Sequence, residues 1–274
     1  SHIDDYNKAS EAYFSVMEYW DGDVNALQYH LNDANWNTLA FDFATKYTAF
    51  NDGIAADNYY KLKGAGLPGA GKSRYAVTFL DSHDTFQRDN NEFCGLGNSM
   101  KYPGKVQQCY AYMLSMPGVP CVFYPHWAKY KDAIGKMVLA RKAAGVHSES
   151  KVTDEAGNGY YKSTIIGKRG SIRLLLGPNS GFNTTPQGYK LAYKGGNFAM
   201  YYTTTESEVP VLSITSSTIY KTDTFVVEMN AIALSGNPII YYTTDGSDPI
   251  TSATKKTYTT AFVIQGTTTV KAYA

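Results

Sequence analysis

The sequence predicts an α/β domain built on a parallel sheet, followed by two smaller all-β domains. Helical and strand patterns alternate from the N-terminus to Gly145, and short strands separated by Gly, Asn and Pro follow beyond it. A second change, to a Thr- and Ser-rich region of alternating strands, comes after Pro210. We therefore expect an α/β domain at residues 1–147, an antiparallel β-domain at 148–205 and a β-sandwich at 210–274.

Four strands and the helices that join them make up the predicted α/β domain. Runs of apolar and β-branched residues place the strands at residues 13–17, 39–43, 76–80 and 119–124. Helices are expected at residues 3–11, a polar segment, and at 23–32, 45–56, 105–116 and 131–144. The helices at 23–32 and 105–116 carry an apolar stripe, Asp23 caps the former, and Gly145 ends the last. Strands that alternate with helices predict a parallel sheet with crossover helices.

This order of elements fits either half of a (β/α)8 barrel or an open, doubly wound sheet. Half a barrel would leave two strand edges unpaired, so we expect the native chain to extend before Ser1. In the two β-domains, alternating patterns predict further strands. These lie at residues 160–166, 171–176, 189–193, 198–203, 225–233, 239–244 and 268–273, and the last three suit an immunoglobulin-like sandwich.

Composition excludes little but points toward sugars. The formal net charge of +1 gives no argument for nucleic acid or an anionic membrane as partner, and no apolar run is long enough to span a bilayer. The 24 tyrosines offer flat faces with hydroxyls that suit sugar rings, although most are expected to fill sheet faces. The 3 cysteines have no metal spacing and predict no disulfide framework.

Ionisable and aromatic side chains follow two of the predicted strands. Glu18, Tyr19 and Trp20 end the first strand, and Asp81, His83 and Asp84 end the third. Carboxylates beside aromatics at the ends of parallel strands predict a sugar-cleaving site. Glu18 is the candidate general acid, because burial against Tyr19 and Trp20 would keep its carboxyl protonated. A salt-bridged or solvated glutamate is the alternative.

The third strand end supplies candidate substrate contacts. The Asp84 carboxylate could stabilise an oxocarbenium-like centre, and the His83 imidazole could donate a hydrogen bond to a sugar hydroxyl. A structural histidine is the alternative for His83. Asp42, within a predicted strand, is expected to make structural hydrogen bonds. Trp127, after His126, could line a cleft or cover the rim of a barrel.

Residues 66–73 match the phosphate-binding P-loop pattern Gly-x-x-x-x-Gly-Lys-Ser. That motif needs a helix that opens at its Lys-Ser, here Lys72 and Ser73. A strand is predicted from residue 76 instead, so we interpret the segment as a Gly-rich connecting loop. A nucleotide-binding protein stays as an alternative that fails if this strand is present.

Several ordered motifs resemble the α-amylase family, glycoside hydrolase family 13. Phe-Leu-Asp-Ser-His-Asp at residues 79–84 resembles its seventh-strand signature, and residues 14–20 are similar to its fifth-strand segment. Residues 40–46 resemble the sixth-strand region of plant-like α-amylases, and residues 107–124 the last helix and eighth strand. The resemblance runs to about Gly145 and implies the second half of a (β/α)8 barrel.

The resemblance assigns roles residue by residue. Glu18 matches the family's general acid/base, Asp84 the carboxylate that stabilises the transition state, and His83 a substrate-binding histidine, with Tyr19 and Trp20 as substrate contacts. Ser82 departs from the commoner Asn. No residue matches the family's nucleophilic aspartate, so we expect the isolated chain to be inactive. Calcium is implied by the family, with its usual ligands outside this sequence, and no metal ligand is assigned here.

The C-terminal residues carry a second resemblance. Residues 240–249 and 268–274 resemble the small sandwich at the C-terminus of chitobiases and related secreted glycosidases, in which Asp245 and Gly246 would form a hairpin turn. Its expected role is that of a spacer or carbohydrate-associated domain.

The resemblance implies a secreted, cell-surface or periplasmic α-amylase, expected to be a monomer, that cleaves internal α-1,4-glucosidic bonds of starch- or glycogen-type glucans with retention. A non-catalytic α-glucan-binding protein on the same scaffold is the alternative. A longer gene that carries the missing aspartate would favour the enzyme, and a gene that starts at Ser1 would favour the binding protein.

Overall fold

The computed structural model describes residues 2–85, 105–216 and 224–274. The chain divides into two compact units, Ser1–Glu206 and Ser207–Ala274, so the first two predicted domains lie in one unit. The loop expected at residues 87–103 lies outside the described residues. In the described part of the chain, no helix is both long enough and apolar enough to cross a membrane.

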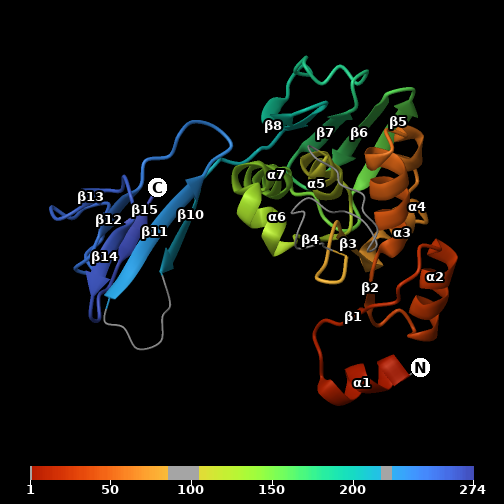
Figure 1. Cartoon of the computed structure of the whole chain (residues 1–274), viewed down its shortest axis with the longest axis horizontal. Helices are drawn as coiled ribbons and strands as arrows, with labels where there is room; N and C mark the ends of the chain where they lie inside the picture. Colours follow the sequence, from red (N-terminus) through yellow and green to blue (C-terminus); the bar gives the residue numbers. More distant parts are fainter. Residues whose placement is uncertain (1, 86–104, 217–223) are drawn as a thin grey trace. The chain divides into compact units, whose positions relative to one another are not determined.

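A four-stranded parallel sheet forms the centre of the first unit (Figure 1). Its strands are β1 (Val16–Met17), β2 (Leu39–Phe41), β3 (Ala76–Phe79) and β4 (Val119–Cys121), and each pairs with the next in the chain. The predicted parallel sheet is therefore confirmed. The order β1-β2-β3-β4 never reverses direction, whereas a doubly wound sheet requires a reversal. These four strands therefore contain no switch point, which fits half of a barrel and equally one half of a doubly wound sheet.

Helices precede, join and follow these strands. Asp23 caps α2 (Val24–Asp33) by accepting a hydrogen bond from the Asn25 N–H, and Gly145 ends α7 in the left-handed conformation at φ 71°. Both helices confirm the predicted caps. The described helices are α1 (His2–Ser10), α2, α3 (Phe43–Thr45), η1 (Lys46–Ala55, a π-helix), η2 (Tyr59–Leu62), α4 (Gly66–Gly69), η3 (Ser73–Tyr75), α5 (Val106–Ser115), α6 (Tyr124–Lys129) and α7 (Lys131–Ala144).

Three strands of the parallel sheet are shorter than predicted by two or more residues. In the first, Tyr13 and Phe14 are exposed and only Val16 and Met17 pair with a neighbour. The second ends at Phe41, because the Asp42 carboxylate caps α3 by accepting from the Thr45 N–H. The fourth ends at Cys121, and α6 starts three residues later.

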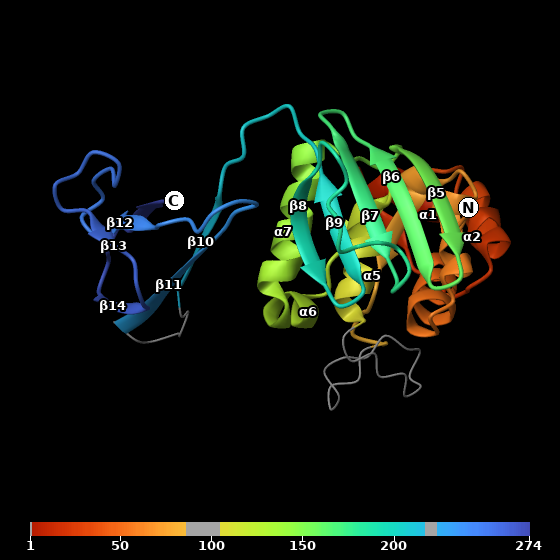
Figure 2. The same ribbon diagram turned by 90° about the horizontal axis from the view of Figure 1, so that it is seen from above.

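An antiparallel sheet completes the first unit and lies against α5 and α7 (Figure 2). Its order is β5-β6-β7-β9-β8, with β5 (Lys151–Gly157), β6 (Tyr160–Ile166), β7 (Ser171–Leu176), β8 (Lys190–Gly195) and β9 (Phe198–Tyr202). Four of these strands were predicted. β5 was not, since its Lys-Val-Thr-Asp-Glu-Ala-Gly sequence buries only Gly157.

The second unit contains two small antiparallel sheets. One has the order β10-β11-β14 and the other β13-β12-β15, and Val227, Met229, Ile240 and Tyr242 form a core with contributions from both. Their bounds are β10 (Val211–Ser216), β11 (Thr224–Ile232), β12 (Tyr241–Thr243), β13 (Lys256–Thr257), β14 (Phe262–Gln265) and β15 (Lys271–Tyr273).

The predicted hairpin turn in this unit is wrong. β12 ends at Thr243 and its partner β13 begins at Lys256, so Asp245 and Gly246 open a long connection instead of a two-residue turn. The Asp245 carboxylate organises this connection. Its Oδ1 accepts from the Ser247 N–H at 3.0 Å, and its Oδ2 accepts from the Thr254 hydroxyl at 2.6 Å.

Candidate functional site

Glu18, Tyr19 and Trp20 follow β1 directly, at the carboxyl edge of the parallel sheet. The Trp20 ring stacks on Phe43 at 5.0 Å, and its indole N–H donates to the Tyr47 hydroxyl at 2.7 Å. Trp20 therefore packs against the helices that follow β2, while 46% of its surface stays exposed. Glu18 is exposed. The burial expected to keep its carboxyl protonated is therefore absent, and that expectation is wrong for this arrangement.

The Tyr19 ring lies 4.0 Å from the ring of His30 in α2, centroid to centroid. This contact fixes the second aromatic beside Glu18. Both Tyr19 and Trp20 keep part of their surface open to solvent. A ring that is held on one side and exposed on the other can stack on a sugar.

His83 and Asp84 follow β3 in an exposed turn at the same edge. The His83 Nε2 lies 3.3 Å from Asp84 Oδ2, and the Asp84 N–H donates to the Ser82 hydroxyl at 3.3 Å. Parallel strands end at one edge, so the sheet brings Glu18 and Asp84 to the same side. One strand, β2, separates their strands, which corresponds to about 10 Å between strand axes. Among the described residues, no hydrogen bond or ion pair joins the two carboxylates.

A buried charge network lies under this turn. The Lys46 ammonium, fully buried, donates to the Leu80 carbonyl oxygen and lies 3.3 Å from Asp81 Oδ1. The Thr85 hydroxyl donates to the same Oδ1 at 2.6 Å and accepts from the Ser82 N–H at 2.9 Å. These bonds close the turn that presents His83 and Asp84. Burial raises the pKa of Asp81 to about 6, although the Lys46 charge acts in the opposite direction.

His126, in helix α6 after β4, continues the network. Its Nε2 lies 3.6 Å from Asp81 Oδ2, and its Nδ1 lies 3.2 Å from the Tyr110 hydroxyl. The Tyr110 oxygen in turn accepts from the Phe123 N–H at 3.2 Å. His126 is fully buried, whereas its neighbour Trp127 is half-buried in α6. The network therefore links the segments that follow β2, β3 and β4.

Sequence reasoning missed Lys46 and Thr85 and gave His126 no role. A lysine in an apolar helix directly after a strand is a usable signal, because a buried lysine needs an acceptor. Its acceptors, however, lie 34 and 35 residues further along the chain, and no local pattern reveals them.

Asp42 has the structural role that the sequence predicted. It is fully buried, accepts from the Thr45 hydroxyl at 2.6 Å and from the Leu67 N–H at 3.1 Å. Burial raises its pKa to about 6, and the Thr45 and Leu67 hydrogen bonds act against that rise. Its carboxylate thereby holds the short helix α4 against the start of α3.

The same geometry rules out the P-loop interpretation. Only the three-residue 3-10 helix η3 starts at Ser73, and β3 follows it at once, so no α-helix opens at the motif. Gly66 is instead buried against Asp42 and Thr45 at φ 59°. The segment connects elements and offers no cradle for a phosphate.

Among residues 2–85, 105–216 and 224–274, no three His, Cys, Asp or Glu side chains cluster in a way that could hold a metal ion. The residues described here therefore do not fit a calcium site.

Comparison with known proteins assigns the two parts of the chain. Residues 231–274 match the family described as "Fn3 associated". An α-amylase type B isozyme of Hordeum vulgare is 34% identical over 131 residues, which cover 46% of this chain and 78% of that protein. A probable α-amylase 2 of Arabidopsis thaliana is 29% identical over 226 residues, or 74% of this chain and 51% of that one.

A glucan 1,4-α-maltotetraohydrolase of Stutzerimonas stutzeri is 30% identical over 183 residues, which cover 61% of this chain and 32% of that enzyme. These relatives are glycoside hydrolases. The chain belongs to the α-amylase family. It spans about half the length of the Arabidopsis relative and a third of the Stutzerimonas one.

Proposed function

We propose that this chain forms the part of an α-amylase that carries its general acid and its transition-state carboxylate. The reaction is the retaining hydrolysis of internal α-1,4-glucosidic bonds in starch- or glycogen-type glucans. The observation that carries the proposal is the common sheet edge of Glu18 and Asp84 in a chain of the α-amylase family. The wider architecture proposed is half of a (β/α)8 barrel, a small β-domain and an immunoglobulin-like module.

Each candidate residue has a chemical role in this proposal. Glu18 protonates the glycosidic oxygen and later accepts a proton from water. Asp84 stabilises the positive charge that develops on the sugar ring, and His83, held 3.3 Å from it, donates to a sugar hydroxyl. Tyr19 and Trp20 stack on the sugar rings beside Glu18.

The exposure of Glu18 has a mechanistic consequence. A general acid must hold its proton near neutral pH, and in proteins this takes desolvation or a nearby negative charge. Because Glu18 is exposed, we propose that this effect comes from bound substrate or from groups outside the described residues. A retaining mechanism also needs a nucleophile about 5–5.5 Å from the acid. Asp84 does not meet that requirement, because its strand axis lies about 10 Å from that of Glu18.

We therefore expect the isolated chain to bind an α-glucan without cleaving it. The direct test incubates the purified chain with soluble starch and measures both retention in a starch-containing native gel and the release of reducing ends. Retention without release supports the proposal. Release of reducing ends would contradict the claim that the chain has no nucleophile. A lack of retention would contradict the claim that it binds α-glucans.

A non-catalytic glucan-binding protein remains the second candidate, because no residue of the sequence matches the family's nucleophile. The sequence encoded upstream of Ser1 in the gene distinguishes the two candidates. An upstream segment with an aspartate at the end of a strand favours the enzyme. The described residues offer no cluster of calcium ligands, so any calcium of the intact enzyme is proposed to bind outside them. Secretion or display at the cell surface is proposed with the enzyme.

A further inference from the structure

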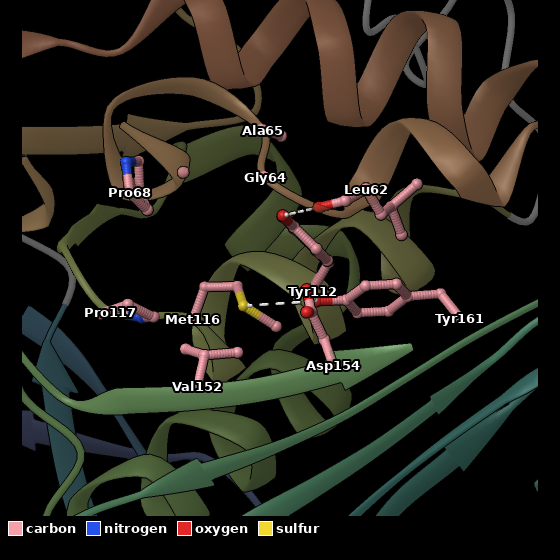
Figure 3. A pocket seen from close by; sticks show the side chains of 11 residues that line it. Leu62, Gly64, Ala65, Pro68, Tyr112, Met116, Pro117, Val152, Asp154 and Tyr161 are labelled. Atoms are coloured by element: carbon pink, nitrogen blue, oxygen red, sulfur yellow. Dashed lines mark hydrogen bonds between the residues drawn. The ribbon is translucent and has the colours of Figure 1, made fainter. Parts of the chain in front are cut away.

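A cavity of about 180 Å³ lies beside the segments that lead into β3 and β4, whereas the candidate glucan site follows the carboxyl ends of the strands; Figure 3 shows the side chains that line the cavity. Its walls come from helices η2, α4 and α5, the residues next to these helices, and strands β5 and β6 of the antiparallel sheet. Apolar side chains make up most of the lining, and two tyrosines and one carboxylate provide the polar groups. The lining side chains used below are Leu62, Tyr112, Met116, Val152, Asp154 and Tyr161.

Both tyrosine hydroxyls in this cavity donate to groups of the protein itself. Tyr112 donates to the Leu62 carbonyl oxygen at 2.8 Å. The Tyr161 hydroxyl has two acceptors within reach, Asp154 Oδ2 at 2.9 Å and the Met116 sulfur at 3.9 Å, and donates to the nearer carboxylate. Burial first of all, and then negative charge that includes Asp154, raises the pKa of both phenols, so both stay protonated at neutral pH. Each oxygen keeps lone pairs for a further donor.

No other side chain of the lining brings a donor. Leucine, alanine, proline, valine and glycine have none, and the Met116 thioether can only accept. Pro68 and Pro117 also lack a backbone N–H. The Gly69 and Met116 N–H groups donate to the Ala65 and Tyr112 carbonyl oxygens. The side chains of the cavity therefore present acceptors and no free donor.

The charge in the cavity is also one-sided. Asp154 forms no ion pair in the described part of the chain, and no lining residue is basic. Its neighbour Glu155 points to the other face of β5 and pairs with Lys162 at 3.3 Å. An anionic or acceptor-rich ligand would find no partner here. A neutral sugar would also lack donors for its own oxygens.

We infer that this cavity binds a small primary alkylammonium ion. Its three N–H donors match the Asp154 carboxylate and the tyrosine oxygens, and its alkyl chain packs against Met116, Val152 and the two prolines. The rings of Tyr112 and Tyr161 pack on each other, with centroids 5.6 Å apart, which holds both hydroxyls in place. This site is separate from the proposed glucan site and does not depend on it.

Titration of the full chain with n-butylammonium, monitored by NMR at constant ionic strength, tests the inference. We expect millimolar binding, with shifts at Val152, Asp154 and Tyr161, and at least about tenfold weaker binding of the neutral isostere n-butanol. Asp154→Asn keeps the shape and should weaken ammonium binding by about tenfold or more. Glu155→Gln, its neighbour on the opposite face, should leave the affinity unchanged.

A second variant guards against misfolding of the first. Val152→Phe fills the cavity without touching the charge, and it should abolish the shifts while the amide spectrum stays folded. Equal affinity for butylammonium and butanol would overturn the inference. Full affinity in a folded Asp154→Asn or Val152→Phe variant would also overturn it. So would the absence of any shift at a butylammonium concentration on the order of 0.1 M, about 100 times the expected millimolar dissociation constant.

Discussion

The side chains of Lys46 and Asp81 form a fully buried ion pair, with Nζ 3.3 Å from Oδ1. Lys46 also donates to the carbonyl oxygen of Leu80, the residue before Asp81. The pair thus joins the helix that follows β2 to the start of the turn that holds His83 and Asp84. A displacement of this pair would therefore move the turn and with it His83 and Asp84, the proposed substrate contacts.

Removal of the Lys46 charge should therefore be costly. In Lys46→Met, Asp81 stays buried without its cation, and we expect a loss of about 3–5 kcal/mol in the free energy of unfolding. Urea unfolding followed by tryptophan fluorescence measures this, because Trp20, Trp36 and Trp127 all lie in the first unit. The double variant Lys46→Met/Asp81→Asn should recover most of the loss.

The matched control is Lys136→Met, which breaks the i,i+4 ion pair between Lys136 and the exposed Asp132 on helix α7. Pairs of this kind contribute about 0–1 kcal/mol, so this variant should unfold almost as the wild type does. Equal losses for Lys46→Met and Lys136→Met would mean that the buried pair has no special role.

Because its pKa is raised, Asp81 should stabilise the folded state more at low pH than at neutral pH. Its pKa is about 6 in the folded chain against an ordinary value of 3.8, so the folded state holds the proton more tightly. Between about pH 4 and pH 6 the folded state therefore loses relative stability as the pH rises, and above about pH 6 the effect is constant.

Asp81→Asn removes this titration. The difference in unfolding free energy between wild type and variant should shift against the wild type as the pH rises through this window. Urea unfolding of both proteins at pH 4.5, 5.5 and 7 checks the sign. A difference that stays constant, or that moves in favour of the wild type, would show that Asp81 titrates normally.

Asp245 predicts the opposite behaviour for the second unit. Hydrogen bonds from Ser247, followed by those from Thr254, lower its pKa from 3.8 to about 2. Its contribution is present above about pH 4 and is lost as the pH falls toward 2. Asp245→Asn should therefore make the NMR signals of residues 224–274 less acid-sensitive, while Glu228→Gln should not. Parallel acid profiles for wild type and Asp245→Asn would refute this.

Two glycines between η2 and β3 allow the cost of close packing to be measured apart from the cost of a positive φ angle. Gly66 and Gly71 have similar positive φ angles of 59° and 72°. A Cβ at Gly66 would lie 2.0 Å from the Thr45 Oγ1 and 2.8 Å from the Asp42 Oδ2, whereas a Cβ at Gly71 meets nothing within 4 Å.

We therefore expect Gly71→Ala to cost about 1–2 kcal/mol from the left-handed conformation alone, and Gly66→Ala to cost about 3 kcal/mol or more. Urea unfolding again provides the measurement. If the two variants lost the same stability, Asp42 would not be held tightly against α4.

The sequence allowed the elements around the site to be predicted where local signals exist. The continuous apolar run at residues 76–80 predicted β3, and Asp23 and Gly145 marked helix ends, because a cap is set by neighbouring residues. The apolar pattern misled at Tyr13 and Phe14, which are exposed. Aromatic residues favour strands without requiring them.

The environment of the site could not be predicted in the same way. Whether Glu18 is buried depends on where the rings of Tyr19 and Trp20 turn, and these pack on His30 and Phe43 in other elements. The Lys46–Asp81 pair joins residues 35 positions apart. Contacts of this kind are tertiary, and neither periodicity nor motif spacing encodes them.

The most direct test of the central claim is to map where an α-1,4-glucan binds the full chain. NMR titration with maltoheptaose should shift the signals of Glu18, Trp20, His83 and Asp84 at the carboxyl edge of the parallel sheet, and Trp20→Ala should weaken binding while Tyr60→Ala should not. The β-1,4-linked cellohexaose should cause no shifts there. Maltoheptaose shifts confined to other parts of the chain, or equal shifts with cellohexaose, would contradict the assignment of this edge as an α-amylase site.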